Sequence, residues 1–233
     1  MKKADQTLME IYEQMLSHFG PRGWWPGKTD FEICVGAILT QSVSWANVEK
    51  AIRNLEALDL LDPYRLNEAD DATIEAAIRS TLYFRQKTKK LKAFCRVLLD
   101  EYQGSLDRLF EQETPGLRKR LLLVKGIGKE TADSIILYAA RQPIFVVDAY
   151  TRRVFSRLGI FKEDITYDEM QAYFHRCLPA DQALYNEYHA LIVGIGNRFC
   201  ANTKPRCGDC PLNQRCKYPA RDAQSPSQRI GKP

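Results

Sequence analysis

A glycine-rich turn near the middle of the 233-residue chain has the composition of a phosphate-binding site. It reads Lys125-Gly126-Ile127-Gly128-Lys129, follows an apolar run and precedes a helical pattern. Glycine lets the backbone adopt positive φ or approach a ligand closely, and the amides at the start of a helix attract anions. The turn lacks the third glycine of a dinucleotide-binding fingerprint and does not match a P-loop. We therefore expect it to bind phosphate, and a plain connection between two helices is the alternative.

A single carboxylate lies a short distance further along the chain. Asp148 follows Val146 and Val147, and Arg152 and Arg153 come one helical turn later. In an apolar setting such a carboxylate could stabilise a developing cation or activate a water molecule. It could also cap the helix expected over residues 149–158, and the two roles are compatible. A phosphate-binding turn and a lone carboxylate together suggest chemistry on a molecule with a phosphate backbone.

The seven cysteines fall into two groups that need separate explanations. Cys34, Cys95 and Cys177 have apolar neighbours and are expected to be buried like other small hydrophobic side chains. The remaining four have C-x6-C-x2-C-x5-C spacing and are Cys200, Cys207, Cys210 and Cys216. Four thiolates this close suit a metal ion or an iron–sulfur cluster, and zinc sites usually have two C-x2-C pairs where this sequence has one. The spacing favours iron–sulfur and leaves zinc open.

Helices must position these groups, because strand patterns are almost absent from the sequence. Apolar residues at three- and four-residue spacing predict helices over 4–19, 71–80, 86–102, 131–140, 149–158, 167–177 and 182–194. Thr29 or Asp30 is expected to cap a further helix, and Ser44 another. Residues 58–64 and 199–218 have the composition of loops, and Gly194-Ile195-Gly196 that of a helix end. The sequence thus predicts an all-α protein.

Composition narrows the class of protein. The chain has 45% hydrophobic and 27% charged residues, which is typical of a soluble globule. Its net charge of +5 is by itself a weak indication of nucleic-acid binding. No apolar run approaches the roughly 20 residues that span a bilayer, and the N-terminus lacks the apolar core of a signal peptide. We expect a cytoplasmic protein whose residues 219–233, rich in polar residues, form a disordered tail.

Together the turn, the aspartate and the four cysteines resemble the helix-hairpin-helix DNA glycosylase superfamily, and within it the endonuclease III group. The resemblance covers residues 5–217, in which residues 123–129 look like the hairpin and Asp148 matches the catalytic aspartate. The cysteine spacing is similar to that of the family's loop for a 4Fe–4S cluster. The family implies two helical domains with damaged double-stranded DNA bound across the cleft, in a nucleoid-associated monomer. The implied parts are a six-helix middle domain at 29–142 and a cluster-containing domain at 143–218. The N-terminal helix at 1–28 is expected to pack with the cluster-containing domain, and the tail follows at 219–233.

One position departs from the endonuclease III pattern. Bifunctional members of that group carry a lysine two residues past the second hairpin glycine, where its amine attacks the sugar. Glu130 occupies that position here, and a carboxylate cannot form a Schiff base. The departure favours a monofunctional glycosylase, in which Glu130 either supports the site or forms a salt bridge at a helix end. We expect Lys129 to be an ordinary basic residue of the hairpin.

A second resemblance is closer and concerns the substrate. The 3-methyladenine DNA glycosylase III branch is similar at Trp24-Trp25-Pro26, at Gln41 and Trp45, at Lys125 to Glu130, and at Val146-Val147-Asp148. That branch holds the damaged base between aromatic side chains, which implies a pocket formed by Trp24, Trp25, Pro26 and Trp45. The alternative is that Trp24 and Trp25 are core residues. The branch member we compare lacks the four-cysteine loop, so this chain departs from it there.

The resemblance also implies which residues contact DNA. A base inside a duplex must be rotated out of the stack before an enzyme can reach it. Gln41 is then expected to fill the hole that the base leaves. Leu82 and Tyr83 are expected to wedge the opposite strand, with ordinary core packing as the alternative. The phosphates near the lesion are expected to contact Lys125, Gly126, Gly128 and Lys129.

These observations lead to one hypothesis and two alternatives. The leading hypothesis is a monofunctional DNA glycosylase of base excision repair that hydrolyses the N-glycosidic bond of a flipped-out alkylated purine such as 3-methyladenine. Asp148 would be its catalytic carboxylate and Glu130 a supporting one, and the 4Fe–4S cluster would be structural and dock DNA. The first alternative is a bifunctional glycosylase and lyase acting on oxidised pyrimidines. The second is a non-catalytic module that binds damaged DNA.

Overall fold

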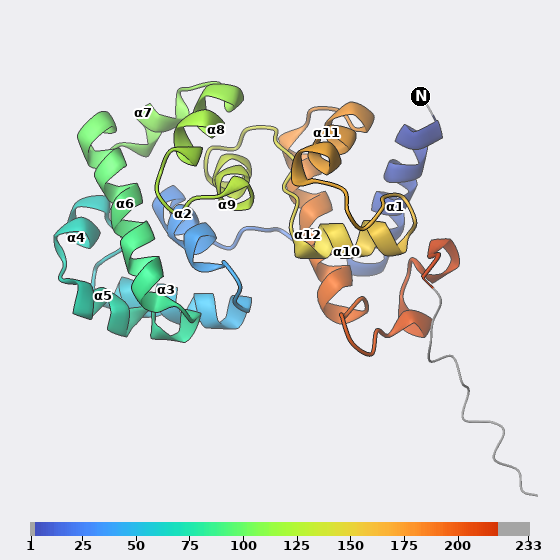
Figure 1. Cartoon of the computed structure of the whole chain (residues 1–233), viewed down its shortest axis with the longest axis horizontal. Coiled ribbons are helices and arrows are strands. Elements are labelled where there is room, and N and C mark those ends of the chain that lie inside the picture. Colours follow the sequence, from blue (N-terminus) through green and yellow to red (C-terminus); the bar gives the residue numbers. More distant parts are fainter. Residues whose placement is uncertain (1–2, 219–233) are drawn as a thin grey trace, which may run out of the picture. The chain divides into compact units, whose positions relative to one another are not determined.

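The computed structural model describes residues 3–218, which fall into two compact units (Figure 1). Unit 1 comprises the described residues up to 22, residues 147–179 and the described residues from 187 onward, and unit 2 comprises 23–146 and 180–186. All regular secondary structure within residues 3–218 is helical, which confirms the predicted all-α class. The domain boundaries expected at residues 28 and 142 stay a prediction. The tail expected over 219–233 lies outside the described residues.

Unit 2 carries the glycine-rich turn. Its α-helices are α2 (Asp30–Leu39), α3 (Trp45–Ala57), α4 (Pro63–Glu68), α5 (Asp71–Ala77), α6 (Phe84–Tyr102), α7 (Leu106–Phe110), α8 (Thr114–Leu122) and α9 (Lys129–Ser134). A 3-10 turn, η1 (Arg79–Thr81), precedes α6, and a π-helical turn, η2 (Ile135–Ala139), continues α9. The sequence predicts one helix over 131–140, and the structure starts it two residues earlier and widens its second half into the π turn.

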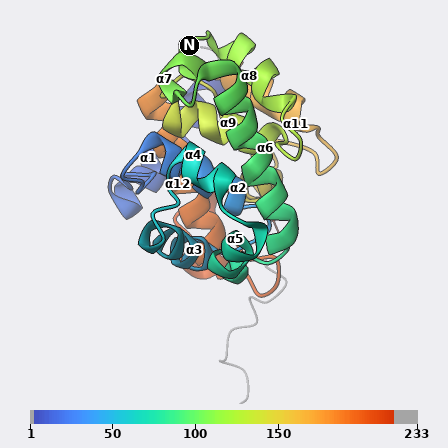
Figure 2. The same ribbon diagram turned by 90° about the vertical axis from the view of Figure 1, so that its left-hand side faces the viewer.

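Helix α2 forms the centre of this unit, because Glu32 is the only charged residue in its sequence after Asp30 and such an apolar helix must be buried. Residues 31–39 are all buried, and the helix packs against α3, α6, α9 and η2. The view in Figure 2 shows the long helix α6 beside α5 and α2, which agrees with the contacts between these helices. Cys34 on α2 and Cys95 on α6 are fully buried, as predicted, and burial raises the pKa of both thiols.

Local capping explains where several of these helices begin. The Thr29 hydroxyl accepts a hydrogen bond from the Glu32 amide at 3.1 Å, so Thr29, one of the two predicted candidates, caps α2. Ser44 occupies the cap position of α3 without a side-chain hydrogen bond. The loop predicted over 58–64 is wrong at its end, because Asp62 accepts from the first amides of α4 and Pro63 takes its first position. Asp followed by Pro is a helix-start signal that favours α4 over a loop.

An ion pair fixes the two helices on either side of the glycine-rich turn. Arg118 of α8 donates through Nε and Nη2 to both carboxylate oxygens of Asp133 on α9, at 2.7 and 3.2 Å. The Asp133 carboxylate is fully buried. A two-pronged bond between a guanidinium and a carboxylate is strong and directional, and losing one partner would leave a buried charge. The pair therefore holds α8 and α9 at a set angle and positions the turn between them.

Unit 1 is built around aromatic packing. Its helices are α1 (Lys3–Phe19), α10 (Ala149–Arg157), α11 (Tyr167–Cys177) and α12 (Gln182–Arg198), of which residues 182–186 belong to unit 2. Phe155 of α10 and Tyr188 of α12 both pack on Phe174 of α11, with ring centroids 5.0 and 6.1 Å from it. The buried Tyr188 hydroxyl donates to the Leu8 carbonyl of α1 at 2.7 Å, and α1 also packs on α11. The core thus joins four segments that are far apart in the sequence.

Helix α12 corrects one prediction from the sequence. Gly194-Ile195-Gly196 predicts a helix end, but α12 continues to Arg198. A Cβ on Gly194 would lie 3.3 Å from the Phe19 ring, and one on Gly196 would collide with the Tyr150 ring. Both glycines therefore serve close packing against aromatic rings inside the helix. No helix within residues 3–218 is both long enough and apolar enough to cross a membrane.

Candidate functional site

The glycine-rich turn uses its two glycines for different purposes. Gly126 has a φ of +90°, in the left-handed region, and a Cβ there would lie 2.5 Å from the side chain of Lys90. Gly128 has an extended backbone with φ −94°, and a Cβ there would meet nothing within 4 Å. The conformation of the turn therefore requires glycine at 126. At 128 the small residue leaves open space in front of the first amides of α9.

The turn is anchored by apolar side chains and presents its charges outward. Val124 and Ile127 are buried, and the Ile127 amide donates to the Val124 carbonyl at 3.0 Å. Lys125 and Lys129 are exposed on the same short segment, and no side chain caps the start of α9 at Gly128. Backbone amides at a helix start, flanked by two ammonium groups, form a site that can hold a phosphate.

Gln41 lies against this turn. Its side-chain amide donates to Thr131 Oγ1 at 2.8 Å and to the Gly126 carbonyl at 3.3 Å. Its Oε1 accepts a short hydrogen bond from Lys90 Nζ. The structure thus brings Gln41 and the hairpin together and adds Lys90, which the sequence analysis did not single out. Filling a gap in a DNA stack would require Gln41 to exchange these partners.

Three tryptophans form one cluster in unit 2. The ring centroids of Trp24 and Trp45 are 4.7 Å apart, and Trp25 lies 5.2 Å from each of them. Tyr138 of η2 also packs on Trp25 at 5.2 Å. All three indoles are half-buried and Pro26 is exposed, so Trp24 and Trp25 are only partly packed into the core, and their role in a base pocket stays a prediction. Trp45 meets the other two rings edge to face, a favourable arrangement for aromatic side chains.

Leu82 and Tyr83 are exposed at the start of α6, which excludes the core-packing alternative. Their exposed fractions are 56% and 67%, and both have positive φ. The buried ammonium of Lys87 holds this bend by donating to the Leu39 and Thr81 carbonyls at 2.8 and 2.5 Å. Burial, together with the charge of the neighbouring Lys90, lowers the pKa of Lys87 to about 8. Two large apolar side chains held outward suit contact with a partner, and their wedge role stays a prediction.

Asp148 divides its carboxylate between two tasks. Oδ1 caps α10 by accepting hydrogen bonds from the Thr151 amide at 2.7 Å and the Thr151 hydroxyl at 2.8 Å. Oδ2 faces Nε2 of His189 at 3.6 Å, and the Asp148 side chain is only 11% exposed. The predicted helix cap is confirmed. Because the cap uses Oδ1 alone, Oδ2 is available for a second role.

The charge on Asp148 is stabilised despite its burial. Burial raises the pKa of this carboxyl, but attraction to His189 and the hydrogen bonds from Thr151 lower it by more, so its pKa lies below the ordinary value. The His189 contact is longer than a hydrogen bond, so attraction between charges carries most of its effect. The sequence analysis missed His189, which lies in the apolar pattern of α12, a region with no local signal that links it to Asp148.

The four clustered cysteines lie together at the end of unit 1. All four are half-buried, whereas Cys34, Cys95 and Cys177 are buried as predicted. Burial and repulsion from the other thiolates raise the pKa of Cys207, and raise that of Cys210 to about 11. In the part of the chain that the structure describes, no three His, Cys, Asp or Glu side chains converge on a position for one metal ion. The four thiols are therefore neighbours without forming a closed site for a single ion.

Two arginines of α10 bind the cysteine-rich segment. Arg157 donates to Cys200 Sγ at 3.2 Å and to the Ala201 carbonyl at 2.8 Å, and Arg153 donates to the Cys200 carbonyl at 2.5 Å. The Cys216 thiol donates to the Arg157 carbonyl at 3.4 Å. Helix α10, which Asp148 caps, therefore also holds the first and last of the four cysteines. Arg157 is a further residue that the sequence analysis did not single out.

Glu130 is exposed in the first turn of α9. Its carbonyl accepts a hydrogen bond from the Ser134 hydroxyl at 2.7 Å. An acidic residue in a first helical turn is favoured by the helix dipole, which is a structural reason for a carboxylate at this position.

The candidate residues are divided between the two units. The hairpin, Gln41 and the tryptophans belong to unit 2, and Asp148, His189 and the four clustered cysteines belong to unit 1.

Comparison with known proteins gives one family. Residues 35–180 match the model of the HhH-GPD superfamily of base excision DNA repair proteins. A protein of Methanocaldococcus jannaschii, provisionally named a DNA repair glycosylase, is 42% identical over 213 residues, which are 91% of this chain and 96% of that protein.

Solved structures agree with the family match. A 3-methyladenine DNA glycosylase of H. pylori bound to 1,N6-ethenoadenine is 28% identical with a TM-score of 0.72, covering 83% of this chain and 97% of that one. A non-covalent endonuclease III–DNA complex has a TM-score of 0.79 at 23% identity, covering 91% of this chain and 95% of that one, and at this identity it supports the fold alone.

Proposed function

Because the chain belongs to the HhH-GPD superfamily of base excision DNA repair proteins, we propose that it is a monofunctional DNA glycosylase for alkylated purines. In this proposal the glycine-rich turn holds the DNA backbone while the damaged nucleotide is rotated out of the duplex. The bond between the base and C1′ of the sugar then breaks, and its electron pair leaves with the base. Water adds to C1′ and loses a proton, which leaves an abasic sugar in an uncut strand.

The observation that carries the proposal is the enclosed, ionised carboxylate of Asp148. Oδ1 caps α10 and Oδ2 faces Nε2 of His189, so the carboxylate keeps a fixed orientation. Its lowered pKa keeps it negative at neutral pH. Such an anion stabilises the positive charge that develops on the sugar as the base departs. A carboxyl with a lowered pKa accepts protons weakly, so this setting supports electrostatic stabilisation more than general base catalysis.

The tryptophan cluster supports an alkylated purine as the substrate. Alkylation makes a purine cationic and electron-poor, and such a ring is attracted to an indole face by up to roughly 2 kcal/mol when water is excluded. The cationic base is already a good leaving group, so the reaction does not need a strong acid. This fits a site with one carboxylate. The 3-methyladenine glycosylase of H. pylori, with 28% identity, is a relative whose name carries this substrate class.

Glu130 supports base removal without strand cleavage. A lyase reaction needs an amine that attacks C1′ and forms a Schiff base, and a carboxylate cannot do so. Glu130 stands in the first turn of α9, where the resemblance to endonuclease III places that amine. We therefore assign Glu130 a supporting role near the hairpin.

The four cysteines fit a 4Fe–4S cluster by donor type, spacing and proximity. Four cysteine thiolates are the ligand set that such a cluster requires. The guanidinium of Arg157 lies 3.2 Å from Cys200 Sγ, where it would stabilise a thiolate. When bound, the cluster would order the cysteine-rich segment, and Cys200, Cys207, Cys210 and Cys216 would hold it.

One experiment tests the proposed reaction directly. Duplexes with 3-methyladenine, 7-methylguanine, 1,N6-ethenoadenine or an oxidised pyrimidine are incubated with the protein, and base release and strand cleavage are scored separately. We expect release of alkylated purines, intact strands before alkali, and no covalent adduct with borohydride. Release of oxidised pyrimidines with borohydride trapping would instead establish a bifunctional enzyme. Tight binding without turnover on any lesion would establish a binding module.

A further inference from the structure

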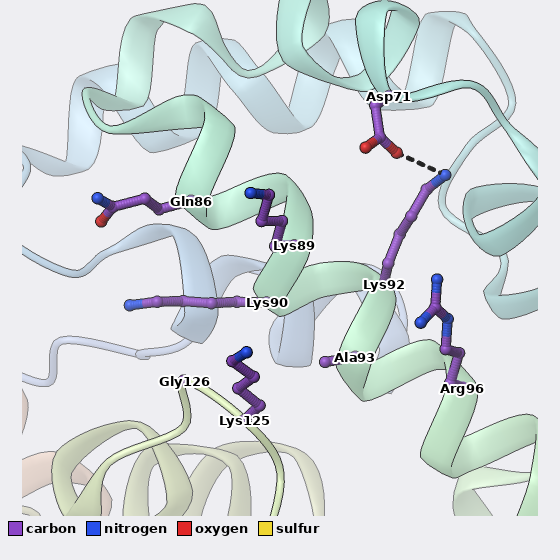
Figure 3. A pocket seen from close by; sticks show the side chains of 9 residues that line it. All are labelled: Asp71, Gln86, Lys89, Lys90, Lys92, Ala93, Arg96, Lys125 and Gly126. Carbon is purple, nitrogen blue, oxygen red and sulfur yellow. Dashed lines mark ion pairs between the residues drawn. The ribbon is translucent and has the colours of Figure 1, made fainter.

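A basic pocket lies on α6 beside the glycine-rich turn, within unit 2 (Figure 3). Its volume is about 470 Å³. The cations that line it are Lys89, Lys90, Lys92, Arg96 and Lys125. Asp71 is the only carboxylate among the lining residues. The pocket therefore has a clear excess of positive charge.

Two of these cations are occupied by groups of the protein. Lys92 binds the Asp71 carboxylate and the Ala69 carbonyl, each at 2.7 Å, and Figure 3 shows its side chain directed at Asp71. Lys90 donates to Gln41. Lys89, Arg96 and Lys125 form no ion pair with any residue in the described range 3–218. Three cations thus remain for an anion from outside the protein.

Several other exposed cations of unit 2 have carboxylate partners, whereas Lys89, Arg96 and Lys125 of the pocket have none within residues 3–218. The paired exposed cations are Lys28, Arg53, Arg65, Arg85 and Arg141. Lys89, Lys92 and Arg96 of the pocket follow one another along α6 at spacings of three and four residues, which places like charges on one face of the helix. Such neighbours repel each other and destabilise the helix slightly. A bound polyanion would remove that repulsion.

The pocket is continuous with the phosphate-binding turn, because Lys125 and Gly126 line both. We infer that this pocket binds backbone phosphates of the DNA strand that passes the glycine-rich turn, as a second phosphate site. The inference rests on the proposed DNA substrate and extends it from the turn to α6. Lys89 and Arg96 are separated by about 10 Å along the axis of α6. At a rise of about 3.4 Å per nucleotide, the face between them matches roughly three nucleotides of one strand.

The salt dependence of DNA binding tests the inference. Affinity for a duplex with an abasic analogue is measured from 50 to 200 mM salt for the wild type and for Lys89→Ala/Arg96→Ala. Each lost phosphate contact reduces the slope of log K against log salt by about 0.9. We therefore expect the advantage of the wild type over the double variant to shrink about tenfold across this range. An unchanged slope would overturn the inference.

Matched variants keep the result interpretable. Lys50 is exposed on α3 without an ion pair in the described chain and lies outside the pocket, so Lys50→Ala should leave the slope unchanged. Lys89 and Arg96 are themselves exposed, so their truncation should leave the fold intact, as the thermal unfolding midpoint will show. A scan with single neutral methylphosphonates locates the contacts. Some methylphosphonates outside the turn should weaken DNA binding by the wild type. The same methylphosphonates should have no effect on DNA binding by the double variant.

Two further measurements distinguish DNA binding at this pocket from the binding of a free small anion and from catalysis. Inorganic pyrophosphate is titrated into the wild type by calorimetry. A pocket for a free small anion would bind pyrophosphate, while the salt slopes for DNA would be equal in the wild type and in Lys89→Ala/Arg96→Ala. That combination would overturn the DNA assignment. Single-turnover base release by Lys89→Ala/Arg96→Ala is also measured at saturating DNA, and its rate should match that of the wild type. If neither protein releases any base, the proposed reaction fails, and the salt slopes still decide whether α6 binds phosphates.

Discussion

The hairpin region of unit 2 and the Asp148 region of unit 1 handle charge in opposite ways. Around the hairpin, Lys89, Lys125 and Lys129 are exposed to solvent. Around Asp148, one carboxylate is enclosed, and it depends on Thr151 and His189 to stay ionised. Exposed charges are screened by salt and contribute nearly independently, whereas an enclosed charge is strong and depends on its neighbours. The comparison predicts graded effects in the first region and an abrupt effect in the second.

The largest effect is expected from Asp148→Asn. The amide keeps the size of the side chain and its cap acceptor, but it removes the negative charge that stabilises the developing cation. Base release at saturating DNA should fall by about 10²–10⁴-fold, with DNA affinity nearly unchanged. Asp164→Asn, which changes an exposed carboxylate of the same unit, is the control and should retain full activity. Equal loss in both variants would remove the distinction between the enclosed and the exposed carboxylate.

A smaller effect is expected from the tryptophan cluster. Trp45→Ala removes a stacking face and should cost about 1–3 kcal/mol of lesion binding, or roughly 5- to 150-fold. Trp45→Phe keeps an aromatic face and should recover most of that loss. Competition between lesion-containing and undamaged duplexes measures it. If both variants keep the preference of the wild type for the lesion, the cluster is not the base pocket.

The two hairpin glycines provide a matched pair. Gly126→Ala forces an alanine to a φ of +90° and against the Lys90 side chain, so unfolding should become easier by about 1–3 kcal/mol. Gly128→Ala meets open space and extended backbone, so stability should stay within about 0.5 kcal/mol of the wild type. If phosphate approaches the α9 amides, Gly128→Ala should still weaken DNA binding. Urea unfolding and DNA titration together separate the two roles, and an alanine at 128 that binds normally would exclude close approach there.

The smallest effect concerns stability and pH. The pKa of Asp148 is lower in the folded chain than in the unfolded one, so its ionised form stabilises the fold above about pH 4. As pH falls through the lowered folded pKa, this contribution is lost. The difference in unfolding free energy between the wild type and Asp148→Asn should therefore shrink as the pH falls below about 4.

His189 offers a control for that pH dependence. His189→Asn removes the attraction that lowers the pKa of Asp148, so the same loss should begin at a higher pH than in the wild type. Urea titrations between pH 3 and 7 measure both curves. A stability difference that already shrinks between pH 7 and 5 in the wild type would mean that burial outweighs His189 and that the carboxyl is protonated more easily than proposed.

Much of the fold could be predicted from the sequence, because the signals are local. Thr29 and Asp148 cap helices through bonds to amides three residues away, and apolar spacing marks most helices to within a few residues. The misses have physical causes too. The pair Asp62 and Pro63 begins a helix inside a predicted loop. Gly196 continues a helix where glycine commonly ends one, because an aromatic ring from another segment needs the space.

By itself the sequence determined the helical class, the turn with its two glycines, the aspartate that begins α10 and the group of four cysteines. Each of these depends on residue type and short spacing. Only the tertiary structure placed His189 beside Asp148, Arg157 beside Cys200, and Lys90 beside Gln41. The partners in these pairs are 41 to 49 residues apart and have no local pattern in common. Packing of the apolar faces of the helices decides which of these residues meet. The same packing decides which charged side chains are buried and which face solvent.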